Sequence, residues 1–173
     1  MAMTLEQAIK TALEFENKVK SAYLEAEQKA KDPVGSKVFG QLAKEEDGHV
    51  AYLESRLEEW RKGGQVTVER LDTIVPDRER IKQGVSRLAK ELKGKKGDHA
   101  AEVQLLQRAL SMEQETSAYY RRMVSELSGE GQKLFARFVE IEEGHVAIVQ
   151  AELDSVTGLG FWFDMQEFRL EAE

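Results

Sequence analysis

The chain has 173 residues, of which 33% are charged and only 2 are proline, and its formal net charge is -7. This length fits one domain with a substantial core, and the composition favours helix over sheet. The negative charge argues against a nucleic-acid surface, which needs a basic face. Cysteine is absent, which excludes disulfides, thiolate metal sites and iron–sulfur centres. Because no apolar run approaches a membrane span and the N-terminus lacks the apolar stretch of a signal peptide, we expect a soluble cytoplasmic protein.

Two long helices are predicted in the first third of the chain, over about 4–31 and 33–62. Thr4 stands three residues before a glutamine, the spacing of a capping box that opens a helix. Asp32 and Pro33 then offer an N-cap and a first-turn proline for the second helix. Both segments carry apolar residues at helical spacing, which predicts a buried stripe on each.

A connection over 63–97 follows, too long for a simple turn between antiparallel helices. Its first part, 65–76, has no helical period, and we expect it to run extended along the bundle. Its second part predicts a short accessory helix from the helical spacing of four apolar residues: Ile81, Val85, Leu88 and Leu92.

Two further long helices are predicted over about 98–127 and 129–157, with a tight turn between them. The tail, 158–173, is rich in aromatic residues between Phe161 and Phe168, so we expect it to pack on the bundle or on a partner subunit. The sequence thus predicts a single all-α domain, in which two helical hairpins joined by a long crossover form a four-helix bundle.

One hexapeptide occurs twice, as residues 46–51 and, with a single conservative difference, as residues 142–147. Each copy contains Glu-x-x-His, and residues three apart on a helix lie on the same face. One carboxylate and one imidazole can therefore converge beside each helix. The two pairs are Glu46 with His49 and Glu142 with His145.

A second repeat lies about thirty residues before each copy. Glu16 is followed seven residues later by Tyr23, and Glu113 by Tyr120. Each hairpin thus contributes a lone glutamate and then a Glu-x-x-His, all within apolar stripes and near the middle of their helices. We expect the two tyrosines to be core residues whose hydroxyls reach a ligand carboxylate.

Burying four ionised carboxylates together costs several kcal/mol for each, which protonation or cations must offset. A single Glu-x-x-His is usually a surface pair, but two copies at matching depth, each with an inward glutamate, favour a metal site. Two divalent cations balance four carboxylates, and two imidazoles complete the ligand set. Hard oxygen and imidazole ligands suit iron or manganese, whereas zinc could bind adventitiously. The predicted ligands, which are also the predicted catalytic residues, are Glu16, Glu46, His49, Glu113, Glu142 and His145.

Three other polar residues stand out less. Glu45 and Glu143 are neighbours of predicted ligands, but adjacent helix positions point elsewhere, so we expect them to support a ligand or to be solvated. His99 follows the crossover at a helix start, and we expect it at the surface.

Glutamates from two helices and Glu-x-x-His from two others are the ligand set of ferritin-like di-iron carboxylate proteins. Along nearly its whole length the chain resembles the rubrerythrin branch of that superfamily, in these ligands, in the two tyrosines and in the tail around Trp162-Phe163-Asp164. The resemblance implies two iron ions in a ferritin-like bundle that reduces hydrogen peroxide or dioxygen and oxidises Fe(II). It also implies a homodimer.

The chain departs from that pattern in two ways. Rubrerythrins carry a rubredoxin module with four cysteines, whereas this chain has none, so electrons would come from a separate donor such as a rubredoxin-like protein. Rubrerythrins also carry an extra carboxylate one turn after the third-helix glutamate, where this chain has Thr116. That difference moves the expected site toward a simpler ferritin arrangement. The alternative function is therefore ferroxidase-linked iron storage in a ferritin-like oligomer, and a metal-free structural bundle is a third reading.

Overall fold

The computed structural model describes residues 3–160 except 92–97, and residues 162–165. Helices are the only regular elements in these ranges, so the all-α prediction is confirmed. The helices are α1 (Leu5–Lys29), α2 (Pro33–Gly63), α3 (Arg78–Glu91), α4 (Ala100–Glu126) and α5 (Gly129–Gly158).

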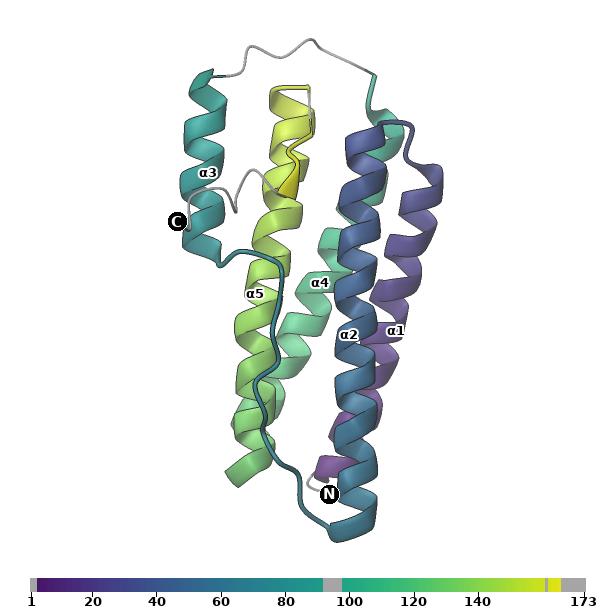
Figure 1. Ribbon diagram of the computed structural model, residues 1–173, viewed down its shortest axis with the longest axis vertical. Helices are drawn as coiled ribbons and strands as arrows, with labels where there is room; N and C mark the ends of the chain where they lie inside the picture. The colour runs from purple at the N-terminus through teal and green to yellow at the C-terminus, as the bar shows by residue number, and fades with distance from the viewer. Residues whose placement is uncertain (1–2, 92–97, 161, 166–173) are drawn as a thin grey trace.

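Four long helices lie side by side along the molecule, and the short α3 lies outside them against α5 (Figure 1). The hairpin partners α1 and α2 pack together, as do α4 and α5, and contacts between α1 and α4 join the two hairpins. Two hairpins joined by a crossover with an accessory helix are as predicted. None of the described helices is long and apolar enough to cross a membrane.

The helix ends follow the predicted capping residues. The Thr4 side chain accepts a hydrogen bond from the backbone of Gln7, whose side chain caps Thr4 in return, which completes the capping box. The Asp32 side chain accepts hydrogen bonds from two backbone N–H groups at the start of α2, where Pro33 occupies the first turn. After α2 the chain turns at Gly64, whose φ of 66° suits a residue without a Cβ atom.

The first part of the crossover runs extended along the bundle, as predicted, from the end of α2 to the start of α3 (Figure 1). It buries Val66, Leu71 and Val75, and the Arg137 guanidinium donates to the Leu71 carbonyl at 2.7 and 3.1 Å. A Cβ atom on Gly144 would lie 3.3 Å from the Pro76 carbonyl oxygen, so glycine allows this close approach to α5. The accessory helix is confirmed as α3; of its predicted apolar residues, Leu92 and the Leu88 side chain lie outside the described part.

The hydrophobic core consists of two clusters, one toward each end of the bundle. On α1 the first cluster ends at Ala12 and the second begins at Val19, which leaves Glu16 between them. The predicted ligands on the other three long helices also lie between a residue of one cluster and a residue of the other. These flanking residues are Ala43 and Leu53 on α2, Ala109 and Tyr119 on α4, and Ile141 and Ile148 on α5. The predicted ligands therefore form one layer between the two apolar clusters, in the middle of the bundle.

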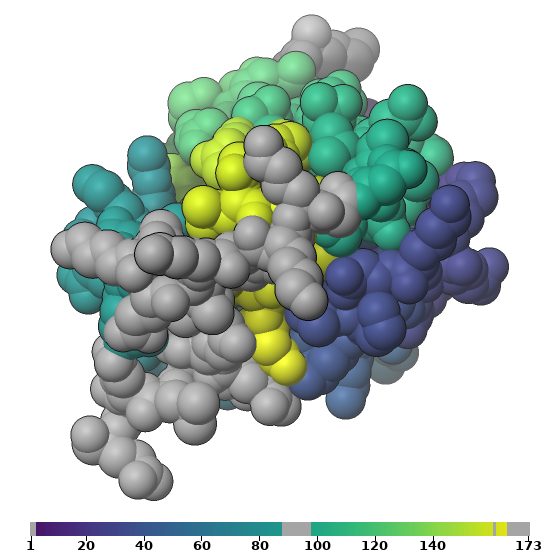
Figure 2. Space-filling model, turned by 90° about the horizontal axis from the view of Figure 1, so that it is seen from above, coloured from purple at the N-terminus to yellow at the C-terminus, as the bar shows by residue number. Residues whose placement is uncertain are grey.

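The described part of the tail packs on the bundle, which confirms one of the two expected positions. Trp162 lies edge-on to Phe39 with ring centroids 5.3 Å apart, and the Phe163 N–H donates to Glu152 at 3.0 Å. Figure 2 shows this end of the molecule, with the last described residues beside the starts of α2 and α4. Phe161 and 166–173 lie outside the described residues.

The expectation that His99 lies at the surface is met only in part. Its ring is half-buried, and its Nε2 lies 3.0 Å from the carbonyl oxygen of Gly160. The physical reason is tertiary: α5 ends beside the start of α4, so a residue from the far end of the chain covers His99.

Candidate metal centre

All six predicted ligands are buried in the middle layer of the bundle. The exposed fraction is 0% for the four glutamates and His145, and 1% for His49. Each carboxylate comes from a different helix, and each imidazole stands three residues after a glutamate on α2 or α5. The i, i+3 spacing therefore turns both members of each pair into the bundle, as the sequence predicted. The set is Glu16, Glu46, His49, Glu113, Glu142 and His145.

Two overlapping groups of these residues could each hold a metal ion. Within each group, one ligand atom per residue lies within 4.8 Å of the others. The first group is Glu16, Glu46, His49 and Glu142, and the second is Glu46, Glu113 and His145. Glu46 belongs to both groups, so its carboxylate could be shared if both groups held an ion.

Both imidazoles direct Nδ1 at the carboxylates. His49 Nδ1 lies 3.1 Å from Glu46 Oε2 and 3.2 Å from Glu16 Oε2. His145 Nδ1 lies 2.8 Å from the other Glu46 oxygen, Oε1. The two rings stack with centroids 5.1 Å apart and an interplanar angle of 20°. The two oxygens of the Glu46 carboxylate therefore face two different imidazoles.

The two tyrosines reach ligand carboxylates across the bundle, as the sequence predicted. The Tyr23 hydroxyl on α1 donates to Glu113 on α4, and the Tyr120 hydroxyl on α4 donates to Glu16 on α1. Both rings are fully buried. Each lone glutamate is thus oriented by the opposite hairpin, which ties the geometry of the centre to the association of the two hairpins.

Several ligand atoms have no hydrogen-bond donor or acceptor in the part of the chain that the structure describes. They include Glu113 Oε2, His145 Nε2 and both oxygens of Glu142, of which Oε1 lies 3.5 Å from His49 Nδ1 in an ion pair without hydrogen-bond geometry. A buried carboxylate oxygen without a donor loses its hydration with nothing in return. Cations of charge +2 fit this donor set, because they would replace the missing donors and neutralise the carboxylates together.

The protein's own means of reducing this cost is to hold protons. Burial, with the Glu46 carboxylate nearby, raises the pKa of Glu16 to about 8. Burial likewise raises the pKa of Glu142 well above its usual range. Burial acts to lower the pKa of His49, but the Glu46 and Glu16 carboxylates outweigh it and raise this pKa to about 10. For Glu46, burial acts to raise the pKa, and the nearby His49 holds it well below its usual range.

Two neighbours of the ligands differ from each other. Glu143 is solvated, with a side chain 45% exposed and an ion pair to Arg121 at 3.2 Å. The Glu45 side chain is only 10% exposed and faces His145, so it is the supporting residue of the two. With His49 and His145, it forms a third group whose ligand atoms lie within 4.8 Å of one another. Sequence reasoning did not place Glu45 beside an imidazole of another helix, and only its position next to a ligand could have suggested it.

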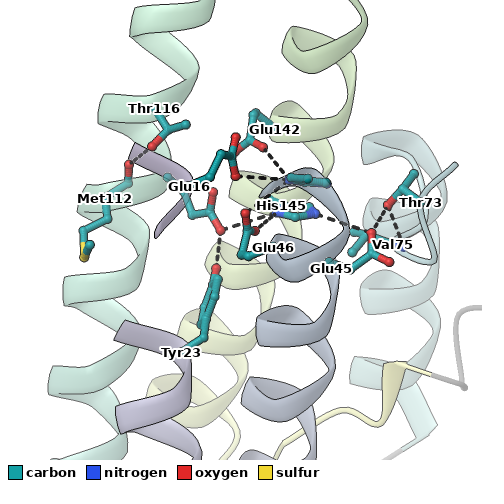
Figure 3. A network of polar contacts seen from close by, with 12 residues as sticks. Glu16, Tyr23, Glu45, Glu46, Thr73, Val75, Met112, Thr116, Glu142 and His145 are labelled. Carbon is teal, nitrogen blue, oxygen red and sulfur yellow. Dashed lines mark hydrogen bonds and ion pairs between the residues drawn. The ribbon is translucent and has the colours of Figure 1, made fainter. Parts of the chain in front are cut away.

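Thr116 is fully buried, and its hydroxyl donates to the Met112 carbonyl in its own helix at 2.9 Å (Figure 3). It supplies no carboxylate at the position where the rubrerythrin pattern has one. Thr116 therefore adds no carboxylate to the Glu and His residues that could hold a metal ion.

Comparison of the chain with protein-family models, with curated proteins and with solved structures gave no match.

Proposed function

We propose that this protein is a ferritin-like di-iron oxidoreductase of rubrerythrin type, which reduces hydrogen peroxide or dioxygen and oxidises Fe(II). One observation carries the proposal: four fully buried carboxylates converge with two imidazoles, and neither oxygen of Glu142 has a hydrogen-bond donor among the described residues. A structural bundle without a metal would keep such a cluster only at a large cost in stability.

The six ligands divide into two positions that share Glu46. One position has Glu16 and His49 as its own ligands, the other has Glu113 and His145, and Glu142 lies within reach of the first. Oxygen and imidazole donors without thiolates suit iron, and manganese fits the same set. A bound pair of such ions supplies the electrons that reduce the oxidant.

The protein's own residues hold and shield the centre. Tyr23 and Tyr120 orient the two lone carboxylates from the opposite hairpin. Phe138 lies edge-on to the His49 ring, with centroids 5.6 Å apart, and belongs to the apolar cluster on one side of the ligand layer. These apolar neighbours exclude bulk water, which strengthens every charge interaction within the layer.

Electrons reach the centre, in this proposal, from a separate donor such as a rubredoxin-like protein, because the chain has no cysteine to hold a second redox centre. The protein acts as a homodimer in the cytoplasm.

The direct test is oxidation of Fe(II) by peroxide. Protein loaded with Fe(II) without oxygen should consume peroxide in fixed ratio to bound iron, with a change in its visible spectrum. Glu46→Ala and His145→Ala should abolish this reaction. The first removes the carboxylate that both proposed metal positions share, and the second removes the imidazole of one position. Glu143→Gln is the matched control, since it removes an exposed carboxylate next to a ligand. Equal activity in all four proteins would refute the proposal.

Thr116 supports a second candidate function, ferroxidase-linked iron storage, because the position lacks the extra carboxylate of the rubrerythrin pattern. The centre would be the same, but iron would pass through it into an oligomeric shell. Size-exclusion chromatography separates the two: a dimer supports the oxidoreductase, and a large cage supports storage.

A further inference from the structure

The two copies of the repeated hexapeptide are preceded by different residues. Aligning 46–51 with 142–147 places Glu45 opposite Ile141. Both positions are largely buried, since the Glu45 side chain is 10% exposed and Ile141 is 2% exposed. The internal symmetry that produces two similar metal positions is therefore broken at one residue beside them.

Glu45 approaches His145 from the side opposite the ligand carboxylates (Figure 3). Its Oε2 lies 3.8 Å from His145 Nε2, while His145 Nδ1 faces Glu46 Oε1 at 2.8 Å. The imidazole thus stands between two carboxylates, one at each ring nitrogen.

The crossover holds the Glu45 carboxylate in this position. The Thr73 hydroxyl donates to Glu45 Oε2 at 2.5 Å, and the Ile74 N–H donates to Oε1 at 3.0 Å. A carboxylate fixed by two donors from another segment is preorganised rather than free to turn toward solvent.

His49 has no such support. Its ring lies edge-on to Phe138, and its ion pairs among the described residues, with Glu16, Glu46 and Glu142, all join its Nδ1 and none its Nε2. The repeat places Ile141, which has no acceptor in its side chain, where the other copy has Glu45. His145 therefore has a carboxylate on the Nε2 side of its ring, whereas His49 has the aromatic ring of Phe138 beside it.

We infer that Glu45 is a positioning residue for His145, and that it makes the metal position of His145 and Glu113 bind a divalent cation more tightly than the position of His49 and Glu16. This inference rests on the proposed dinuclear centre. A neutral imidazole that uses Nδ1 as ligand carries its proton on Nε2, and a carboxylate that accepts this proton fixes the tautomer and makes Nδ1 a stronger donor. Among the described residues, Glu45 lies 3.8 Å from His145 Nε2, an ion-pair distance from which a small side-chain movement would allow it to accept this proton, whereas the ion pairs of His49 all join its Nδ1.

The test is titration with Co(II) alone in oxygen-free buffer, followed by visible absorption and calorimetry. Wild-type protein should bind two ions with unequal dissociation constants. Glu45→Gln keeps an oxygen for the crossover donors but loses the charge, and should weaken the tighter site on the order of 10-fold. Glu143→Gln, an exposed neighbour of a ligand, should leave both constants unchanged.

The tautomer provides a second readout, which a merely structural role would not change. In Zn(II)-loaded protein labelled with ¹⁵N-histidine, the Nε2 proton of His145 should exchange slowly with solvent, and Glu45→Gln should accelerate this exchange while His49 is unaffected.

Three results would overturn the inference. An isotherm of Glu45→Gln that superimposes on wild type shows that Glu45 does not support His145. A wild-type stoichiometry of three that falls to two in Glu45→Gln makes Glu45 a direct ligand in its group with His49 and His145. If wild-type protein binds no Co(II), both this inference and the proposed dinuclear centre are refuted, whereas the first two results refute the inference alone.

Discussion

Two sets of buried carboxylates in this bundle have the same exposure but different surroundings. Glu142 in the middle layer and Glu102 near one end are 0% and 1% exposed. One oxygen of Glu102 accepts from the backbone N–H groups of Lys31 and Asp32 at 2.8 and 3.2 Å, whereas neither oxygen of Glu142 has a donor among the described residues. Burial acts to raise both pKa values; for Glu102 these N–H groups hold the pKa below its usual range, whereas the pKa of Glu142 is raised well above it.

Glu152 belongs with Glu102, because it is fully buried on α5 and accepts from the Phe163 N–H at 3.0 Å. Glu102 caps the turn between α1 and α2, and Glu152 holds the tail. Burial of a glutamate therefore does not by itself identify a metal ligand. The distinguishing features are convergence with other Glu and His side chains and, for Glu142, the lack of a hydrogen-bond donor among the described residues.

The largest expected difference is in metal binding. Glu142→Ala should abolish binding of at least one Fe(II), because it removes a carboxylate from the four-residue group. Glu152→Ala should keep the wild-type stoichiometry, although it lies on the same helix. Metal analysis of the two anaerobically loaded variants measures this, and an equal loss of metal in both would erase the distinction between the two sets.

Binding to the middle layer should depend strongly on pH. The pKa values of Glu16 and His49, about 8 and about 10, mean that both groups carry a proton at pH 7 in chelator-treated protein. A metal ion needs the deprotonated ligands, so binding releases protons and tightens as pH rises toward these values. The dissociation constant for Co(II) should fall by about tenfold per pH unit for each proton released. A constant that stays level between pH 6 and 8 would contradict these shifts.

Bound metal should also stabilise the fold. At a free ion concentration of about 100 times the dissociation constant, the expected gain is ~2.7 kcal/mol. For a chain of this length that raises the melting temperature by roughly 5–10 °C. Differential scanning calorimetry before and after chelation measures it, and Glu142→Ala, which loses at least one ion, should show a smaller gain than wild type.

The carboxylates outside the middle layer should affect stability instead. Glu102→Ala leaves two backbone N–H groups without their acceptor and should cost about 1–3 kcal/mol in the free energy of unfolding. Urea denaturation of chelated and metal-loaded samples should show the same loss in both. A loss confined to the metal-loaded sample would place Glu102 with the metal ligands.

The smallest effect is expected for the tyrosines that orient the lone glutamates. Tyr120→Phe removes the hydroxyl that donates to Glu16 and keeps the packing of the ring. Metal stoichiometry should remain, while the free energy of unfolding falls by about 1 kcal/mol. Tyr119→Phe serves as the control, because its hydroxyl donates to the Ala8 carbonyl and not to a ligand. Loss of a bound ion in Tyr120→Phe alone would give the hydroxyl a larger role.

Much of the fold and most of the site are local properties of the sequence. The i, i+3 spacing fixes Glu46 and His49 on one face of α2, and the capping residues at Thr4 and Asp32 begin the first two helices. The accessory helix α3 follows from its apolar period in the same way. These features need only contacts between residues a few positions apart, which is why pattern and spacing predict them.

What the sequence by itself determined is therefore the set of helices and the six inward-facing Glu and His residues, because helix geometry and the repeat place them without reference to other segments. Only the tertiary structure decided that Glu45 faces His145, that His99 is covered by Gly160, and that Glu102 and Glu152 are buried on backbone donors. The physical reason is that each of these contacts joins segments distant in the chain, and the packing of the crossover and the tail on the bundle brings them together.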